Sequence, residues 1–89
     1  MNFRIESEFE AKVLYEYSVA IEESSYLVIY GKHINGYFCS IPNWGKGCEL
    51  GSPENVGYNQ EKLIEKCDFS EKTALELAKS IEYISYMSK

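Results

Sequence analysis

Proline and histidine are scarce in this chain, and its few cysteines stand far apart. The sequence has two prolines, one histidine (His33) and three cysteines, at positions 39, 48 and 67. An odd number of cysteines without a CxxC pair predicts reduced thiols rather than a disulfide framework. Structural zinc sites normally use two close pairs of ligands, which His33, Cys39, Cys48 and Cys67 do not provide. We therefore expect no metal and no cofactor.

A long hydrophobic run and an export signal are also missing. No apolar stretch approaches the roughly 18 residues of a membrane span, so we expect no membrane partner. The opening segment "MNFRIESEFE" has no basic head and no apolar stretch before a cleavage site, which makes the cytoplasm the expected location. The 89 residues, of which 45% are hydrophobic, predict one domain over residues 1–89.

Positive charge is in short supply. Nine Lys and Arg against fourteen Asp and Glu give a net charge of −5 at pH 7. Such an acidic domain repels a phosphate backbone, so we expect no direct binding of nucleic acid and a protein partner with a basic surface. The first 23 residues concentrate the negative charge, because they contain six glutamates against Arg4 and Lys12: Glu6, Glu8, Glu10, Glu16, Glu22 and Glu23.

The segment that holds most of these glutamates fits two periodicities. Its apolar residues share one arc of a helix, yet five of them also alternate as in a strand: Val13, Tyr15, Tyr17, Val19 and Ile21. A strand from Phe3 to Ile21 would be unusually long, and no Gly, Pro, Asn or Asp interrupts it to make a hairpin. Ser7 and Glu10 also fit a helix capping box. We therefore predict an N-terminal helix from about Glu8 to Glu23.

The next segment predicts a β-hairpin over residues 26–41. The β-rich runs "SYLVIYGKHI" and "YFCSIP" flank Asn35 and Gly36, a pair typical of a type I′ turn. This turn would place Ile34 opposite Tyr37. One face would then carry Tyr26, Val28, Tyr30, Ile34, Tyr37, Cys39 and Ile41, and the other Leu27, Ile29, His33 and Phe38.

After the hairpin, the glycine-rich stretch "PNWGKGCELGSPENVGYN" predicts turns around a short third strand near residues 48–50. A short helix from Asn59 and a longer one after "DFS" follow, the second with a buried stripe of Ala74, Leu77, Ala78, Ile81 and Ile84. Ser70 alone, or Asp68 with Glu71, would cap it. The expected fold is α+β: a small antiparallel sheet, made of the hairpin and the third strand, with an N-terminal helix and two C-terminal helices.

Catalytic motifs are weak. A catalytic Cys39 or Cys48, activated by His33, would need a lowered thiol pKa. A helix that begins after the cysteine could lower it, but the sequence predicts no helix start after either residue. Glu49 and Glu54 are more simply solvated loop carboxylates, and "GKGCELGS" lacks the spacing of a phosphate-binding loop. We therefore predict a non-enzymatic protein with no catalytic residue.

Aromatic residues are abundant, with eight tyrosines and one tryptophan. Tyrosines suit interfaces because they are rigid, apolar in body and polar at the tip, although an aromatic-rich core would also account for them. We expect part of this set to be exposed: Tyr15, Tyr37, Trp44, Tyr58, Tyr83 and Tyr86. The predicted partner-binding residues are Tyr37 and Trp44 together with Glu6, Glu8, Glu10, Glu16, Glu22 and Glu23.

The stretch "SYLVIYGKHINGYFCSIPNWGKGCEL", with "YNQEKL" after it, resembles short, functionally uncharacterised proteins of low-G+C Gram-positive bacteria and their mobile elements. The resemblance covers residues 25–63 and implies no activity. Small acidic proteins of mobile elements are often inhibitors of host defence, including CRISPR nucleases. By analogy of size, charge and setting, the leading hypothesis is an inhibitor that occludes a basic groove. The alternative is a small housekeeping domain that homodimerises or binds a small ligand through a tyrosine-rich face.

Overall fold

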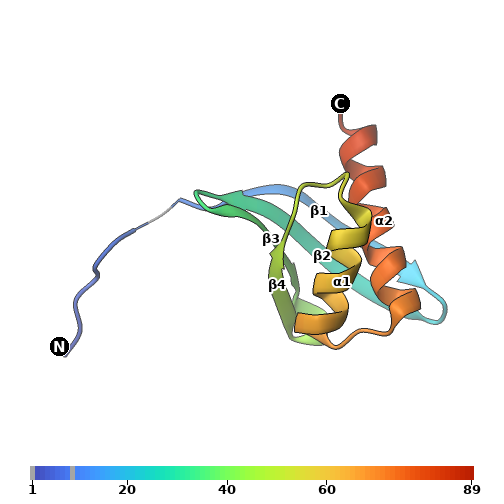
Figure 1. Ribbon diagram of the computed structural model, residues 1–89, viewed down its shortest axis with the longest axis horizontal. Coiled ribbons are helices and arrows are strands. Elements are labelled where there is room, and N and C mark those ends of the chain that lie inside the picture. The colour runs from blue at the N-terminus through green and yellow to red at the C-terminus, as the bar shows by residue number, and fades with distance from the viewer. Residues whose placement is uncertain (1, 9) are drawn as a thin grey trace.

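Four antiparallel strands are followed by two helices in the computed structural model, which describes residues 2–8 and 10–89 (Figure 1). Each strand pairs with the next, so the sheet order is β1-β2-β3-β4 and both β1 and β4 are edge strands. The elements are β1 (Lys12–Ile21), β2 (Ser24–His33), β3 (Gly36–Ile41), the 3-10 turn η1 (Pro42–Trp44), β4 (Lys46–Leu50), α1 (Val56–Cys67) and α2 (Glu71–Met87). The α+β class is thus confirmed, together with the two C-terminal helices.

The predicted N-terminal helix is wrong, and so is the three-stranded sheet. Residues 12–21 form β1 and pair with β2, with Tyr17 opposite Val28; position 9 of the predicted helix lies outside the described residues. The connection needs no glycine or asparagine because Glu22 itself adopts a left-handed conformation, at φ 57°. Its carboxylate lies 2.7 Å from Lys72 Nζ, which ties this turn to α2.

The hairpin between β2 and β3 has the predicted faces but a different turn. His33 pairs with Gly36 and Lys32 with Tyr37, so the two connecting residues are Ile34 and Asn35. Gly36 starts β3 at φ 144°, a conformation open to glycine, and the backbone N–H of Asn35 donates to His33 Nδ1 at 3.1 Å. The register is displaced by two residues, so the side chains within β2 and β3 keep their predicted faces, whereas Ile34, predicted to face Tyr37, lies in the turn.

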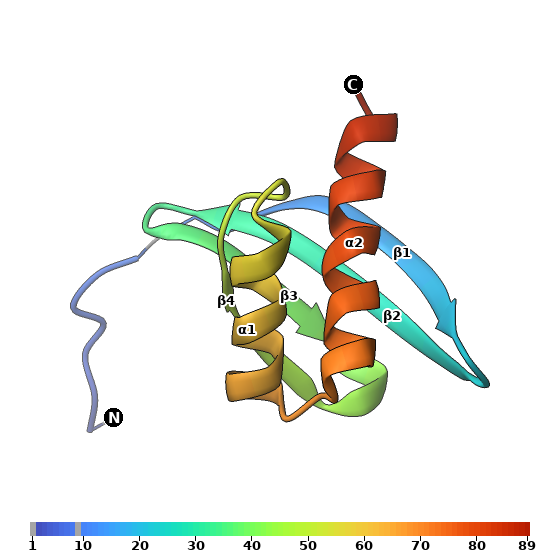
Figure 2. The ribbon, with the colours of Figure 1, turned by 45° about the vertical axis from the view of Figure 1, so that its right-hand side comes forward.

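Both helices pack on the same face of the sheet (Figures 1 and 2). The predicted stripe of α2 is buried except for Ile84, which is partly exposed. Ser70 alone caps this helix, since its Oγ accepts from the backbone N–H of Thr73 at 3.2 Å. The core between helices and sheet contains Ile21, Tyr26, Val28, Tyr30, Cys39, Ile41, Leu50, Leu63, Cys67, Phe69, Ala74, Leu77, Ala78 and Ile81.

The loop around Trp44 is fixed to the end of β2 by aromatic stacking and hydrogen bonds. Trp44 stacks on Tyr26 with ring centroids 4.9 Å apart, and its Nε1 donates to the carbonyl of Ser25 at 3.0 Å. The Asn43 side chain donates to the same carbonyl and accepts from the N–H of Leu27 at 3.0 Å. These bonds replace the ladder partners that β2 lacks beyond the end of β3.

Gly31 provides a test of this packing. A Cβ at this position would meet the Phe38 ring and would lie 2.6 Å from the carbonyl oxygen of Lys12, which belongs to backbone and has little room to move. We expect Gly31→Ala to lower the free energy of unfolding by about 1–3 kcal/mol in urea denaturation. Gly57→Ala is the control, because nothing lies within 4 Å of a Cβ there and alanine favours the helix. Equal stability of the two variants would contradict this account.

Candidate functional site

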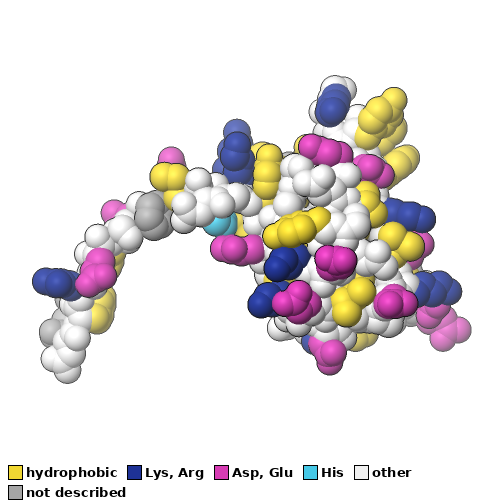
Figure 3. Space-filling view, viewed as in Figure 1, with side chains coloured by type: hydrophobic (Ala, Val, Ile, Leu, Met, Phe, Trp, Pro, Cys, Tyr) yellow, Lys and Arg dark blue, Asp and Glu magenta, His cyan; other side chains and the backbone are white. Residues whose placement is uncertain are grey.

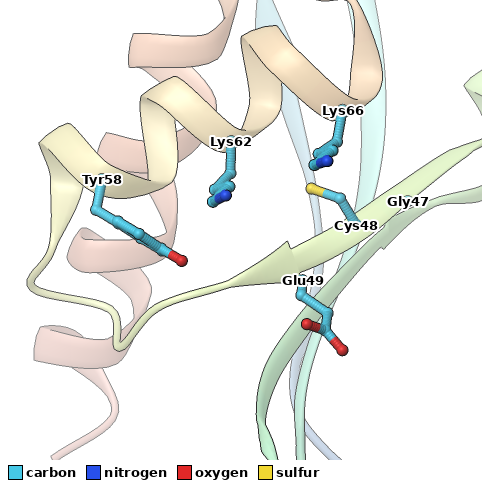
Figure 4. Close-up of a pocket in the computed structure, with 6 residues that line it drawn as sticks. All are labelled: Gly47, Cys48, Glu49, Tyr58, Lys62 and Lys66. Carbon is cyan, nitrogen blue, oxygen red and sulfur yellow. The ribbon is translucent and has the colours of Figure 1, made fainter.

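A pocket of about 410 Å³ lies between the edge strand β4 and helix α1 (Figure 4). Its lining residues come from these two elements: Gly47, Cys48 and Glu49 from β4, and Tyr58, Lys62 and Lys66 from α1. Figure 4 shows the three side chains of α1 pointing toward the strand, while Glu49 points away on its opposite side. We call this pocket the β4–α1 groove.

The helix presents its groove side chains as one line. Tyr58, Lys62 and Lys66 follow at intervals of four residues, and residues four apart lie on the same side of a helix. Lys62 Nζ lies 5.5 Å from the centre of the Tyr58 ring, a cation–π contact. Lys66 Nζ lies 3.8 Å from a carboxylate oxygen of Glu65. The α1 wall of the groove therefore presents two lysine side chains, although the protein as a whole is acidic.

A buried amide fixes α1 in place over β4. The side chain of Asn59 is fully buried; its Oδ1 accepts from the N–H of Gly51 at 2.7 Å, and its Nδ2 donates to the carbonyl of Ser52 at 3.1 Å. The buried hydroxyl of Tyr30 donates to the carbonyl of Gly51 at 2.7 Å. The turn that leads from β4 to α1 is thus held by both the helix and the sheet.

The three cysteines, far apart in sequence, converge beside this groove. Cys39 lies opposite Cys48 in the β3–β4 register, and the Cys48 side chain lies beside Cys67 of α1. Burial raises the pKa of Cys39 to about 12. Burial and the neighbouring Cys67 side chain also raise the pKa of the Cys48 thiol, against the opposing effect of the Lys62 ammonium. The Cys39 and Cys48 thiols are therefore protonated near neutral pH, and the groove offers the ammonium groups of its lysines rather than a nucleophile.

The residues considered as a cysteine–histidine pair lie on opposite sides of the sheet. His33 shares a side with Phe38, on which it stacks at 6.0 Å, whereas Cys39 and Cys48 face the helices. Among residues 2–8 and 10–89, no group of three or more His, Cys, Asp and Glu is placed to hold a metal ion. Glu49 and Glu54 also have different neighbours, since Glu54 accepts from Ser52 Oγ at 3.0 Å in the following loop.

The predicted partner-binding residues do not form one surface. Glu6, Glu8 and Glu10 lie in the exposed segment before β1, and Glu22 and Glu23 lie in the turn at its other end. Tyr37 is partly buried at the start of β3, where it stacks on Tyr30 with ring centroids 5.6 Å apart, and Trp44 follows the opposite end of β3. Glu16 is the only one of these six glutamates that lies within a strand, opposite Ile29.

Glu16 belongs to the face of the sheet that the helices leave uncovered. Phe38 covers Gly31 there, and His33 Nε2 lies 3.8 Å from Glu49 Oε1. We call this surface the open sheet face; by the strand register it carries Val13, Glu16, Leu27, Ile29, His33, Phe38 and Glu49. Sequence alternation did assign most of these side chains to one face, but could not show that no helix covers it.

The exposed tyrosines and Trp44 lie outside the open sheet face, on α1, on α2 and in η1. Tyr58, Tyr83, Tyr86 and Trp44 are exposed, which confirms part of the expected exposure, whereas Tyr15 and Tyr37 are partly buried. A second pocket, of about 330 Å³, lies at the C-terminal end of α2 and is lined by Glu54, Glu82, Tyr83, Ser85, Tyr86 and Lys89. In the described part of the chain, no helix is long and apolar enough to span a membrane.

A family model that is described as a family of unknown function, DUF6618, matches residues 2–89. The chain belongs to the DUF6618 family. The comparisons with curated proteins and with solved structures found no match. For this member of DUF6618, the geometry of the groove and of the open sheet face is therefore the basis for an argument about function.

The thiols make a prediction about reactivity. A thiol with a pKa of about 12 is only about one part in 10⁴ thiolate at pH 8, and the thiolate is the reactive form. In native protein we expect iodoacetamide to modify Cys39 and Cys48 orders of magnitude more slowly than a free cysteine, because burial raises the pKa of both thiols. The rates should rise with pH toward pH 12, and denaturant should abolish the differences. Peptide mass spectrometry measures this; rapid native labelling of Cys39 would contradict the burial.

Proposed function

We infer that the chain is a non-enzymatic protein-binding module whose contact surface is the open sheet face. The observation that carries this inference is a four-stranded sheet with helices on one face only (Figure 2). Leu27, Ile29 and Phe38 lie partly exposed at its centre, and Val13 is 51% exposed at its edge. An apolar centre with a polar border is the usual composition of a protein interface.

Charge on this face favours a basic partner. Glu16 and Glu49 border the apolar centre, and Glu49 has a side chain that is 83% exposed. The lysines of the strands face the helix side instead: Lys32 contacts Tyr37, Lys46 contacts Phe69, and Lys12 pairs with Lys32. In the four strands, all of them described, the open sheet face therefore has carboxylates but no Lys or Arg. A basic surface would approach it faster and bind it more specifically than an acidic one.

The proposed partner is a nucleic-acid-handling complex of host defence, because the groove in which such a complex binds nucleic acid is basic. Binding would then inhibit by occlusion, without any chemical step.

We assign the module to the cytoplasm, because Cys39 and Cys48 lie opposite each other across two strands and are nevertheless free thiols. Unbonded neighbouring thiols are typical of a reducing compartment.

Charge reversal on the open sheet face tests the proposal. Tagged protein is used to capture partners from a host lysate over a salt series, and the affinity of a captured basic protein is then measured by calorimetry. We expect Glu16→Lys with Glu49→Lys to weaken binding by about tenfold or more, because two attractive contacts become repulsive.

The matched control is Glu76→Lys with Glu82→Lys on α2, which makes the same change in net charge away from the sheet. We expect this control to retain most of the wild-type affinity. If the two double variants lost the same affinity, the effect would come from net charge alone, which would contradict binding through the open sheet face. Protection from hydrogen exchange on the helices alone, upon binding, would contradict it as well.

A further inference from the structure

We propose that the β4–α1 groove binds the N-terminal arm (residues 2–8) of a second copy of this chain, which adds to the sheet as a strand beside β4. This inference concerns a different surface from the open sheet face and does not depend on the function proposed above. It rests on three observations: a free strand edge, a line of lysines beside that edge, and an exposed acidic arm of strand-like sequence.

The first observation is the edge of β4. This strand pairs with β3 on one side only. Within the described chain, the backbone of residues 46–49 makes hydrogen bonds only in the β3–β4 ladder, so the outer edge keeps its N–H and C=O groups available. An unpaired edge is a template for another strand, and an extended peptide that adds to it gains main-chain hydrogen bonds.

The second observation is the spacing of the lysines above this edge. Lys62 and Lys66 are four residues apart on α1, which corresponds to about 6 Å along a helix. Side chains two residues apart on one side of a strand are separated by about 6.6–6.8 Å. An extended peptide with carboxylates at every second residue therefore matches the two ammonium groups. The Glu49 carboxylate does not lie between the strand and the two lysines, because the side chain points to the other side of β4 (Figure 4).

The third observation is the arm itself. Charged and apolar side chains alternate along it, with Arg4, Glu6 and Glu8 on one parity and Phe3 and Ile5 on the other. Phe3 and Ile5 are 69% and 68% exposed, an unusual state for two large apolar side chains so close together. Figure 3 shows the arm standing clear of the body, with hydrophobic and charged side chains along it. The arm is long enough to pair with the five residues of β4.

Placed beside β4 with its glutamates toward α1, the arm would also turn Arg4 to that side, where its guanidinium lies 3.8 Å from the Glu6 carboxylate within the arm. Glu6 and Glu8 would meet Lys62 and Lys66, and the alternation of a strand would turn Phe3 and Ile5 to the other side of the sheet. There they would lie beside Glu49 at the border of the open sheet face, with β4 between them and Phe38, which lies opposite Glu49. The Glu65 carboxylate near Lys66 remains at the rim of the groove.

A second copy is the occupant because the arm and the groove lie at opposite edges of one sheet. The arm leads into β1, and β2 and β3 separate β1 from β4. In Figure 1 the arm leaves the body on the side away from the helices. Reciprocal exchange of arms between two chains buries both arms and closes the assembly as a two-fold dimer, the commonest symmetry of oligomers.

Charge exchange between arm and groove tests the proposal on the full chain. Sedimentation equilibrium over a wide concentration range should show a monomer–dimer equilibrium for the wild type. We expect Glu6→Lys with Glu8→Lys, and separately Lys62→Glu with Lys66→Glu, to raise the dissociation constant by about tenfold or more. Lys79→Glu with Lys89→Glu, on α2 and at the C-terminus, has the same charge change as the second variant and should leave it nearly unchanged.

An equimolar mixture of the arm variant and the groove variant should associate again, because each arm then meets a groove of opposite charge. Circular dichroism of each variant verifies that the fold is intact. A wild type that stays monomeric at all concentrations would overturn the proposal, as would docking of the arm within one chain. Dimers that form equally well in both variants, or a mixture that does not associate, would overturn it too.

Discussion

The buried amide of Asn59 is the constraint on which the rest of the structure depends. It bonds both to the N–H of Gly51 and to the carbonyl of Ser52, while Tyr30 holds the carbonyl of Gly51 from the sheet. Three partly buried polar groups of one turn thereby find partners that the turn itself could not supply, and leaving a buried group of this kind unpaired costs about 1–3 kcal/mol. Because the same bonds set the distance between β4 and α1, they also set the width of the groove in which Lys62 and Lys66 lie.

The C-terminal half of the fold could be predicted from the sequence, and the first strand could not. The helices have a single clear period and a serine cap at Ser70, so local information suffices. Residues 12–21 satisfy both periods, and the choice depends on pairing with β2, which is not a local property. The absence of a turn residue was also a misleading sign, because Glu22 takes a positive φ that asparagine or glycine usually provides, while Lys72 holds its carboxylate.

The site shows the same division between local and distant information. The line of Tyr58, Lys62 and Lys66 is visible in the sequence as a four-residue repeat, but only the packing of α1 on β4 makes it the wall of a groove. The convergence of three cysteines from β3, β4 and α1 leaves no sign in their spacing. The acidic residues before β1 drew attention through their charge, whereas their alternation with Phe3 and Ile5 acquires meaning only beside a free strand edge.

The consecutive order of the strands has a further consequence, for the speed of folding. Every strand pairs with its neighbour in sequence, through connections of two residues at the first two turns and of a short 3-10 turn at the third. Closing such short loops costs little chain entropy, and topologies dominated by local contacts fold faster than those that must join distant segments. The four strands can therefore pair one after another in the order of the sequence. The slower event is the docking of α2 on β1, which joins Ser80 to Tyr17 across most of the chain.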